Sequence, residues 1–250
     1  GAQGVSTFQN NGAFINAGNT NQFLNGSGSL RFNNAGSVSI TGGRLDLYSG
    51  GTHSGSFALS EGRSMYLQGT QSFLAESTIS PTGWIGVLGG TTTLAHESLA
   101  FNNLSVEGGT LAGPTSITAS QLYLSGGAYS LTGAVTVNTL TMVGTGNLTP
   151  GAPATVSGSA TFSPSNDVYV QRDLTLNGTA TWTGVRVNLY NATVTNPLED
   201  AGMDSDRVAV QMLKGVAIGA VGIPPFLVGL VVVRRARVRE RRTQSLRKNW

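Results

Sequence analysis

The sequence predicts an all-β fold, a parallel β-helix with coils of about 18–20 residues, followed by a single C-terminal transmembrane helix. Three observations predict it. Glycine supplies 35 of 250 residues and charged residues only 11%, a composition rich in turns and poor in helix-favouring charges. Short apolar pairs recur at a nearly constant interval, and a long uncharged run close to the carboxyl end precedes a cluster of arginines. There is no cysteine, so neither a disulfide framework nor a zinc cluster holds this fold.

The repeated unit is a pair of apolar residues two positions apart, usually with glycine soon after. Successive pairs begin 20, 20, 19, 18, 18, 20 and 14 residues apart. The pairs are Leu45/Leu47, Met65/Leu67, Ile85/Val87, Leu104/Val106, Leu122/Leu124, Leu140/Met142, Ala160/Phe162 and Leu174/Leu176. Such a period over many units is typical of a solenoid.

Alternation sends one side chain inward and the next outward, so each pair marks a short strand. Further pairs of this kind lie between the repeats, and Gly, Ser, Asn and Asp supply the turns. Several strands in 18–20 residues fit one β-helix coil, and residues 1–195 predict about ten coils stacked roughly 4.8 Å apart. An antiparallel sandwich also has short strands and turns, but it rarely keeps such a register.

The inward columns follow from the repeat. We expect Leu104, Leu122 and Leu140 to stack inside the coil, with Ser105, Tyr123 and Thr141 facing solvent. The first residues carry no polar cap, so we expect the first coil to be covered by another chain or by further coils of this one.

The run 104–158 reads L-x-V-x-G-G-T-L-x-G and then V-T-V-x-x-L-x-M. It resembles the right-handed parallel β-helices of secreted adhesins and autotransporter passengers, and it is equally similar to repeat ectodomains on protist surfaces. The resemblance implies a β-helical surface protein with an adhesive or structural role. It implies no particular site, because the cadence reflects stacking.

The carboxyl end predicts a membrane anchor. Residues 196–207 are acidic and contain proline, which indicates a linker. Residues 208–233 predict a transmembrane helix kinked at Pro224-Pro225, since 215–233 carry no charge. Gly215 and Gly219 form a G-x-x-x-G pair that is a candidate helix–helix contact.

Residues 234–250 form a basic tail with eight basic residues against one acidic, whereas residues 1–233 hold seven against eleven. We expect the tail to be cytoplasmic, the β-helix extracellular or lumenal, and an arginine cluster to lie at the membrane surface. That cluster comprises Arg234, Arg235, Arg237, Arg239, Arg241 and Arg242. The lipid bilayer is then a partner. Nucleic acid is not expected to be one, because the large domain is mildly acidic.

The sequence offers little chemistry. His53 and His96 are far apart, so no metal site or cofactor is expected, and we expect both in loops at the solvent edge. Trp84 and Trp182 are possible sugar platforms but do not form one stripe, and packing is the favoured role. Five possible N-glycosylation sites occur, a number that chance explains: Asn25, Asn103, Asn147, Asn177 and Asn191.

These features favour a non-catalytic, membrane-anchored structural or adhesive β-helix, a spacer or a subunit of a larger assembly with protein partners or self-association. One alternative is a carbohydrate-binding or polysaccharide-degrading enzyme, because parallel β-helices also host such chemistry, and glycans are then partners. Another is a bacterial surface protein whose C-terminal segment is a sorting tail.

Overall fold

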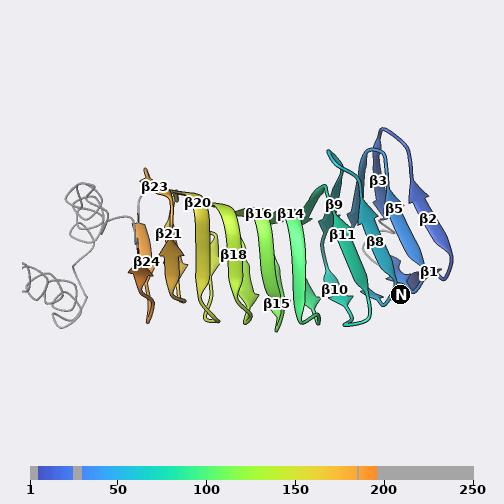
Figure 1. Ribbon diagram of the computed structural model, residues 1–250. Coiled ribbons are helices and arrows are strands. Elements are labelled where there is room, and N and C mark those ends of the chain that lie inside the picture. The colour runs from blue at the N-terminus through green and yellow to red at the C-terminus, as the bar shows by residue number, and fades with distance from the viewer. Residues whose placement is uncertain (1–4, 25–29, 185, 196–250) are drawn as a thin grey trace, which may run out of the picture. The chain divides into compact units, whose positions relative to one another are not determined.

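The computed structural model describes residues 5–24, 30–184 and 186–195. The elements of this part are all β-strands, and they wind into a parallel β-helix of about nine turns (Figure 1). The predicted all-β, parallel solenoid is therefore confirmed, with slightly fewer turns than expected. The predicted linker, transmembrane helix and basic tail, 196–250, lie outside the described residues.

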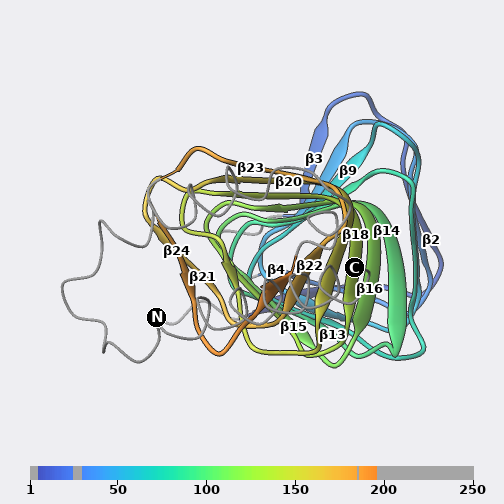
Figure 2. The same ribbon diagram turned by 60° about the vertical axis from the view of Figure 1, so that its left-hand side comes forward.

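The coils have three faces, which Figure 2 shows superposed from one coil to the next. The first face is a ten-stranded parallel sheet. It contains β1 (Ser6–Asn10), β4 (Leu30–Asn34), β7 (Gly51–His53), β10 (Thr70–Phe73), β13 (Thr91–Leu94), β15 (Thr110–Gly113), β17 (Ala128–Leu131), β19 (Asn147–Leu148), β21 (Asp167–Val170) and β24 (Arg186–Leu189).

In the first coils the second and third faces are formed by separate strands. The second face begins with β2 (Ala13–Asn16), β5 (Ser37–Ile40), β8 (Ser56–Leu59) and β11 (Thr78–Pro81). The third face begins with β3 (Asn21–Leu24), β6 (Arg44–Leu47), β9 (Ser64–Leu67) and β12 (Trp84–Val87).

Longer strands then cross both faces, namely β14 (Ser98–Val106), β16 (Ser116–Leu124), β18 (Val135–Val143) and β20 (Ala154–Ser163). Beyond β20 the faces separate again. The first part of β20 pairs with β22 (Leu174–Leu176), which pairs with β25 (Val194–Thr195), and its second part pairs with β23 (Thr179–Trp182).

The predicted leucine column is present. Leu122 pairs in parallel register with Leu104 on one side and Leu140 on the other, and all three are buried. Apolar side chains from the three faces form one continuous core along the described coils. The irregular step of 14 residues also has an explanation. Leu174 belongs to the second face, where it pairs with Ala154, and the third-face repeat continues from Ala160 to Ala180.

The glycines that follow the apolar pairs stack at the corner where each coil turns from the third face to the first. Gly90 has a φ of +68°, and a Cβ there would meet the carbonyl oxygen of Gly69 at 2.1 Å. A Cβ on Gly127 would meet the carbonyl oxygen of Gly109 at 2.3 Å. The repeated glycine is therefore required because the backbones of successive coils approach closely at this corner.

Candidate functional site

The two histidines lie inside the coil, so the expectation of solvent-edge loops was wrong. His53 is the last residue of β7, and its Nε2 lies 2.9 Å from Oε1 of the buried Gln71. The Gln71 amide nitrogen donates to the carbonyl oxygens of Leu47 and Gln68. The glutamine oxygen therefore accepts a hydrogen bond from Nε2–H, and His53 is held as the neutral Nε2–H tautomer.

His96 holds a corner between coils. Its Nε2 lies 3.0 Å from the hydroxyl of Ser77 and 2.8 Å from the carbonyl oxygen of the same residue. Thr115, one coil further on, donates to the backbone oxygens of His96 and Leu94. Both histidine rings therefore link one coil to a neighbouring coil through hydrogen bonds.

The stability of the protein is expected to fall in acid because of His53. Desolvation by burial lowers the pKa of His53 from 6.5 to about 4, against the hydrogen bond with Gln71, which raises it. The unfolded chain therefore binds the proton more tightly, and stability present above pH 6.5 is lost as the pH falls toward 4. This pKa difference corresponds to about 3 kcal/mol at full protonation.

Chemical denaturation of the wild type and of His53→Gln, measured from neutral pH to pH 4, tests this expectation. The variant retains a hydrogen-bonding side chain without a titrating ring, so its loss of stability in acid should be smaller by about that amount. An equal loss in both proteins would contradict the assignment.

A buried arginine joins the turns of the later coils. All the N–H groups of Arg172 donate to backbone carbonyls of earlier coils, namely Thr149 at 2.8 Å, Leu131 at 2.6 Å, Gly133 and Ala152 at 3.4 Å, and Pro150 at 3.5 Å. Its guanidinium carbon lies 5.3 Å from the ring centroid of Tyr129. Burial lowers the pKa of Arg172 and raises that of Tyr129.

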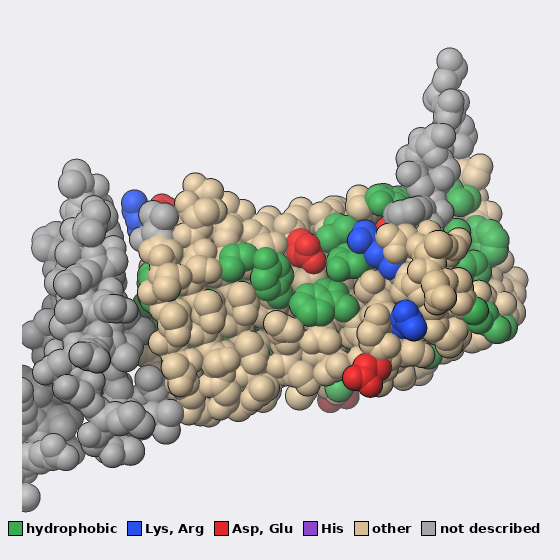
Figure 3. Space-filling view, turned by 90° about the horizontal axis from the view of Figure 1, so that it is seen from above, with side chains coloured by type: hydrophobic (Ala, Val, Ile, Leu, Met, Phe, Trp, Pro, Cys, Tyr) green, Lys and Arg blue, Asp and Glu red, His purple; other side chains and the backbone are tan. Residues whose placement is uncertain are grey.

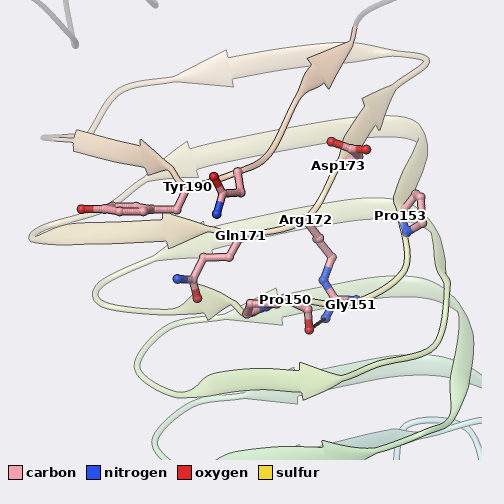
Figure 4. A pocket seen from close by; sticks show the side chains of 8 residues that line it. Pro150, Gly151, Pro153, Gln171, Arg172, Asp173 and Tyr190 are labelled. Atoms are coloured by element: carbon pink, nitrogen blue, oxygen red, sulfur yellow. Dashed lines mark hydrogen bonds between the residues drawn. The ribbon is translucent and has the colours of Figure 1, made fainter. Parts of the chain in front are cut away.

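Arg172 also lines an open pocket of about 330 Å³, where its side chain reaches toward the turn at Pro150 and Gly151 (Figure 4). The other lining residues are Pro153, Gln171, Asp173, Tyr190 and Asn191. A guanidinium has five N–H donors, and here the five contacts to carbonyls occupy them. The arginine therefore acts as a brace for the turns, and it has no donor left for a bound anion.

A second group of side chains lies on the outer surface of the third face. We call Arg44, Asp46, Tyr66, Trp84, Ser105 and Glu107 the outer cluster. They come from β6, β9, β12 and β14 and from the residue after β14, so four consecutive coils contribute. In Figure 3 hydrophobic side chains gather on one face of the rod, with acidic and basic side chains beside them.

One half of the outer cluster is an ion pair against an aromatic ring. Nε of Arg44 lies 2.6 Å from Oδ1 of the buried Asp46, and the guanidinium carbon lies 4.0 Å from the ring centroid of Tyr66. The hydrogen bond to Asp46 raises the pKa of Arg44. Burial raises the pKa of Tyr66, and the negative charge of Glu107 raises it further. The charges of Asp46, Glu107 and Arg44 therefore all act on Tyr66.

The other half is a chain of hydrogen bonds. Nε1 of Trp84 donates to the hydroxyl of Ser105 at 2.9 Å, and that hydroxyl donates to Oε1 of Glu107 at 2.7 Å. Ser105 was expected to face solvent, but it is 0% exposed. The expectation about its direction was sound, because Ser105 alternates with the inward Leu104 and Val106. It is buried because neighbouring outer side chains cover it.

Sequence reasoning missed the outer cluster. The available signal was the outward residue between the two apolar members of each repeat, because these positions pair from coil to coil. Asp46 pairs with Tyr66, Tyr66 with Gly86, and Gly86 with Ser105. Comparing these outward positions from one coil to the next would have indicated that Asp46, Tyr66 and Ser105 lie in one column.

The predicted glycosylation sites are dispersed. Asn177 and Asn191 are exposed, whereas Asn103 and Asn147 are half-buried. The side-chain oxygen of Asn147 accepts a hydrogen bond from the backbone of Tyr169. Asn25 lies outside the described residues, as do Gly215, Gly219 and the arginines of the tail.

Within 5–24, 30–184 and 186–195, no three His, Asp or Glu side chains are grouped so as to hold a metal ion. In the same ranges there is no helix that is both long and apolar enough to cross a membrane. The predicted span 208–233 falls outside them.

The fold and its braces place this chain in the class of parallel β-helix solenoids. No protein-family model matches the chain, and neither a curated protein nor a solved structure matches it significantly. Its function is therefore argued from its own geometry.

Proposed function

We propose that the chain is a non-catalytic structural and adhesive element, a rod that presents its outer surface to partners at a membrane. One observation supports it above the others. Buried polar side chains bind one coil to a neighbouring coil, as His53, His96 and Arg172 do. These buried side chains, which could otherwise take part in catalysis, form hydrogen bonds that hold the coils together.

The outer carboxylates also fit this role better than glycoside hydrolysis. Asp46 is three parallel strands away from Ser105, the partner of Glu107, so their backbones are separated by about 14 Å at the usual strand spacing. Hydrolytic pairs lie about 5–10 Å apart across the scissile bond.

A turnover screen of the full chain on polysaccharides tests the proposal. We expect no product above a protein-free control. Robust turnover that disappears in Glu107→Gln, with folding unchanged, would overturn it. Circular dichroism of the variant supplies the folding control.

The proposed anchor is the segment 208–233, with the basic tail on the cytoplasmic side. Its support is the uncharged stretch followed by the arginine cluster. Alkaline extraction of membranes from cells making the full chain should leave it in the membrane fraction. Release into the supernatant at an intact mass would contradict the anchor, and a mass lacking the segment would favour the sorting-tail alternative.

The first coil is the proposed site of association with another parallel coil. Phe8 and Phe32 occupy the same column in neighbouring strands, yet Phe8 is 42% exposed and Phe32 1%. Val5 and Ile15 in the same coil are also exposed. One further coil stacked on β1 would bury Phe8 as β1 buries Phe32.

Phe8→Glu is therefore expected to weaken self-association. The charge would have to enter a stacked apolar column, so the dissociation constant should rise by tenfold or more, which corresponds to about 1.4 kcal/mol. Sedimentation equilibrium of the full chain measures it. Thr7→Glu, on the neighbouring exposed position of β1, is the control. Equal behaviour of the two variants would contradict the proposal.

A further inference from the structure

We propose that the outer cluster binds a neutral glycan, with a sugar ring stacked on Trp84 beside the Tyr66–Arg44 pair and its hydroxyl groups bound by Arg44 and Glu107. The proposal deepens the adhesive part of the proposed function by naming a ligand class and a site.

The cluster departs from the rest of its face. On β18, β20 and β23 the outward positions of the third face carry small hydroxyl side chains, namely Thr139, Thr141, Ser159, Thr161, Thr179 and Thr181, whereas β16 carries Gln121 and Tyr123 there. The outer cluster instead places two large aromatic side chains on neighbouring strands, with charged groups on either side. The stacking of the coils requires neither aromatic nor charged side chains at outward positions. We therefore assign this group a role other than folding.

A glycine shapes the platform. A Cβ on Gly86 would meet Cδ1 and Cε1 of Tyr66 at 2.5 Å and the hydroxyl oxygen of Ser105 at 2.8 Å. The ring edge with Cδ1 and Cε1 therefore occupies the space that a side chain at position 86 would fill, on the strand that carries Trp84, and the guanidinium of Arg44 lies over the ring. The half-buried indole of Trp84 supplies the flat apolar area on which a sugar ring can stack through its C–H groups.

The polar groups are held in place beside the rings. Ser105 bridges the indole of Trp84 and the carboxylate of Glu107, and Asp46 fixes the guanidinium of Arg44. A carboxylate accepts and a guanidinium donates, so together they match the mixed donors and acceptors of sugar hydroxyls. Their positions are set before any ligand binds, which reduces the entropic cost of binding.

The charges favour a neutral ligand. The cluster holds Arg44 against Asp46 and Glu107, so it carries one more negative charge than positive. An anionic polysaccharide would be repelled by Glu107, and the one guanidinium is already paired with Asp46. A neutral oligosaccharide meets neither obstacle.

Titration of the full chain with oligosaccharides, followed by calorimetry, tests the proposal. The probes are the neutral hexasaccharides of β-1,4-glucose, β-1,4-mannose, β-1,4-N-acetylglucosamine and α-1,4-glucose, and the anionic hexasaccharide of galacturonic acid. We expect at least one neutral probe to bind with a dissociation constant below about 1 mM. Binding of none of them at that level, or a preference for the galacturonic acid probe, overturns the proposal.

Variants place the binding on the cluster. Trp84→Ala and Glu107→Gln should each weaken binding by about tenfold or more, which corresponds to about 1.4 kcal/mol. Tyr169→Ala, which removes an exposed aromatic ring on the first face, should leave it unchanged. Equal losses in all three variants, or none in Trp84→Ala, would overturn the assignment.

A pair of glycine variants tests the platform without touching its polar groups. Gly86→Ala must displace Tyr66 and should weaken binding, whereas a Cβ on Gly89 meets only the Gln68 side chain at 4.0 Å, so Gly89→Ala should bind as the wild type does. Equal binding by both variants would remove Tyr66 from the site. If glycan binding alone fails, self-association through the first coil and the absence of turnover are still expected. Failure of the glycan proposal is therefore distinguishable from failure of the proposed function.

Discussion

Replacing Arg172 by alanine is expected to lower the free energy of unfolding by about 2–6 kcal/mol, because its two shortest hydrogen bonds, to Leu131 and Thr149, are lost and each unsatisfied carbonyl costs about 1–3 kcal/mol. The side chain is buried, and it donates to the carbonyls of Leu131, at the end of β17, and Thr149, directly after β19. Its loss would leave those oxygens without their protein donor, and each buried group left unsatisfied costs about 1–3 kcal/mol.

Two further variants separate the hydrogen bonds from the charge. Arg172→Lys keeps the charge but has three donors in place of five, so its loss should be intermediate. Arg186→Ala is the control, because Arg186 forms a half-exposed ion pair with Asp167 at 3.2 Å, and such pairs contribute less than about 1 kcal/mol. Chemical denaturation measures all three. A loss for Arg172→Ala no larger than for Arg186→Ala would show that the turns do not depend on this brace.

The repeat predicted the β-helix because two of its features are enforced locally. The apolar pairs record which side chains enter the core, and the corner glycines record where one backbone approaches the next. Gly90 and Gly127 show why the second signal is strong, since a Cβ at either position would overlap the backbone of the preceding coil. Both signals recur in most coils, so they survive small changes in coil length.

The outer cluster and the buried polar residues were not predictable in the same way. Alternation tells on which side of a strand Ser105 lies, but its burial depends on Trp84, which is 21 residues earlier in the chain. His53 likewise looks like a loop residue in sequence, because it ends a three-residue strand among Ser and Gly. Its partner Gln71 is 18 residues away. The burial and partners of such residues depend on contacts between coils, and the sequence of a single coil does not reveal these contacts.

Replacing Leu122 is expected to have the largest effect of any single change on the third face. Leu122 is buried between Leu104 and Leu140 in parallel strands, which are about 4.8 Å away on each side. Leu122→Ala would leave a cavity that neighbouring coils cannot close, because their backbones are fixed by continuous hydrogen bonding. The expected loss is about 2–5 kcal/mol.

Leu122→Asp should lower stability further than the alanine variant, because it places an unpaired carboxylate among apolar side chains. Burial would raise the pKa of that carboxyl group, so the stability difference between this variant and the wild type should narrow as the pH falls and the group is neutralised, whereas the difference for Leu122→Asn should not. Tyr123→Ala is the matched control on the adjacent, outward and half-buried position, and its expected loss is smaller than that of Leu122→Ala. Denaturation of the four variants at neutral and acid pH gives the order. A tyrosine variant as unstable as Leu122→Ala, or an aspartate variant as stable as the wild type, would contradict an inward Leu122 and with it the coil register on which the stack depends.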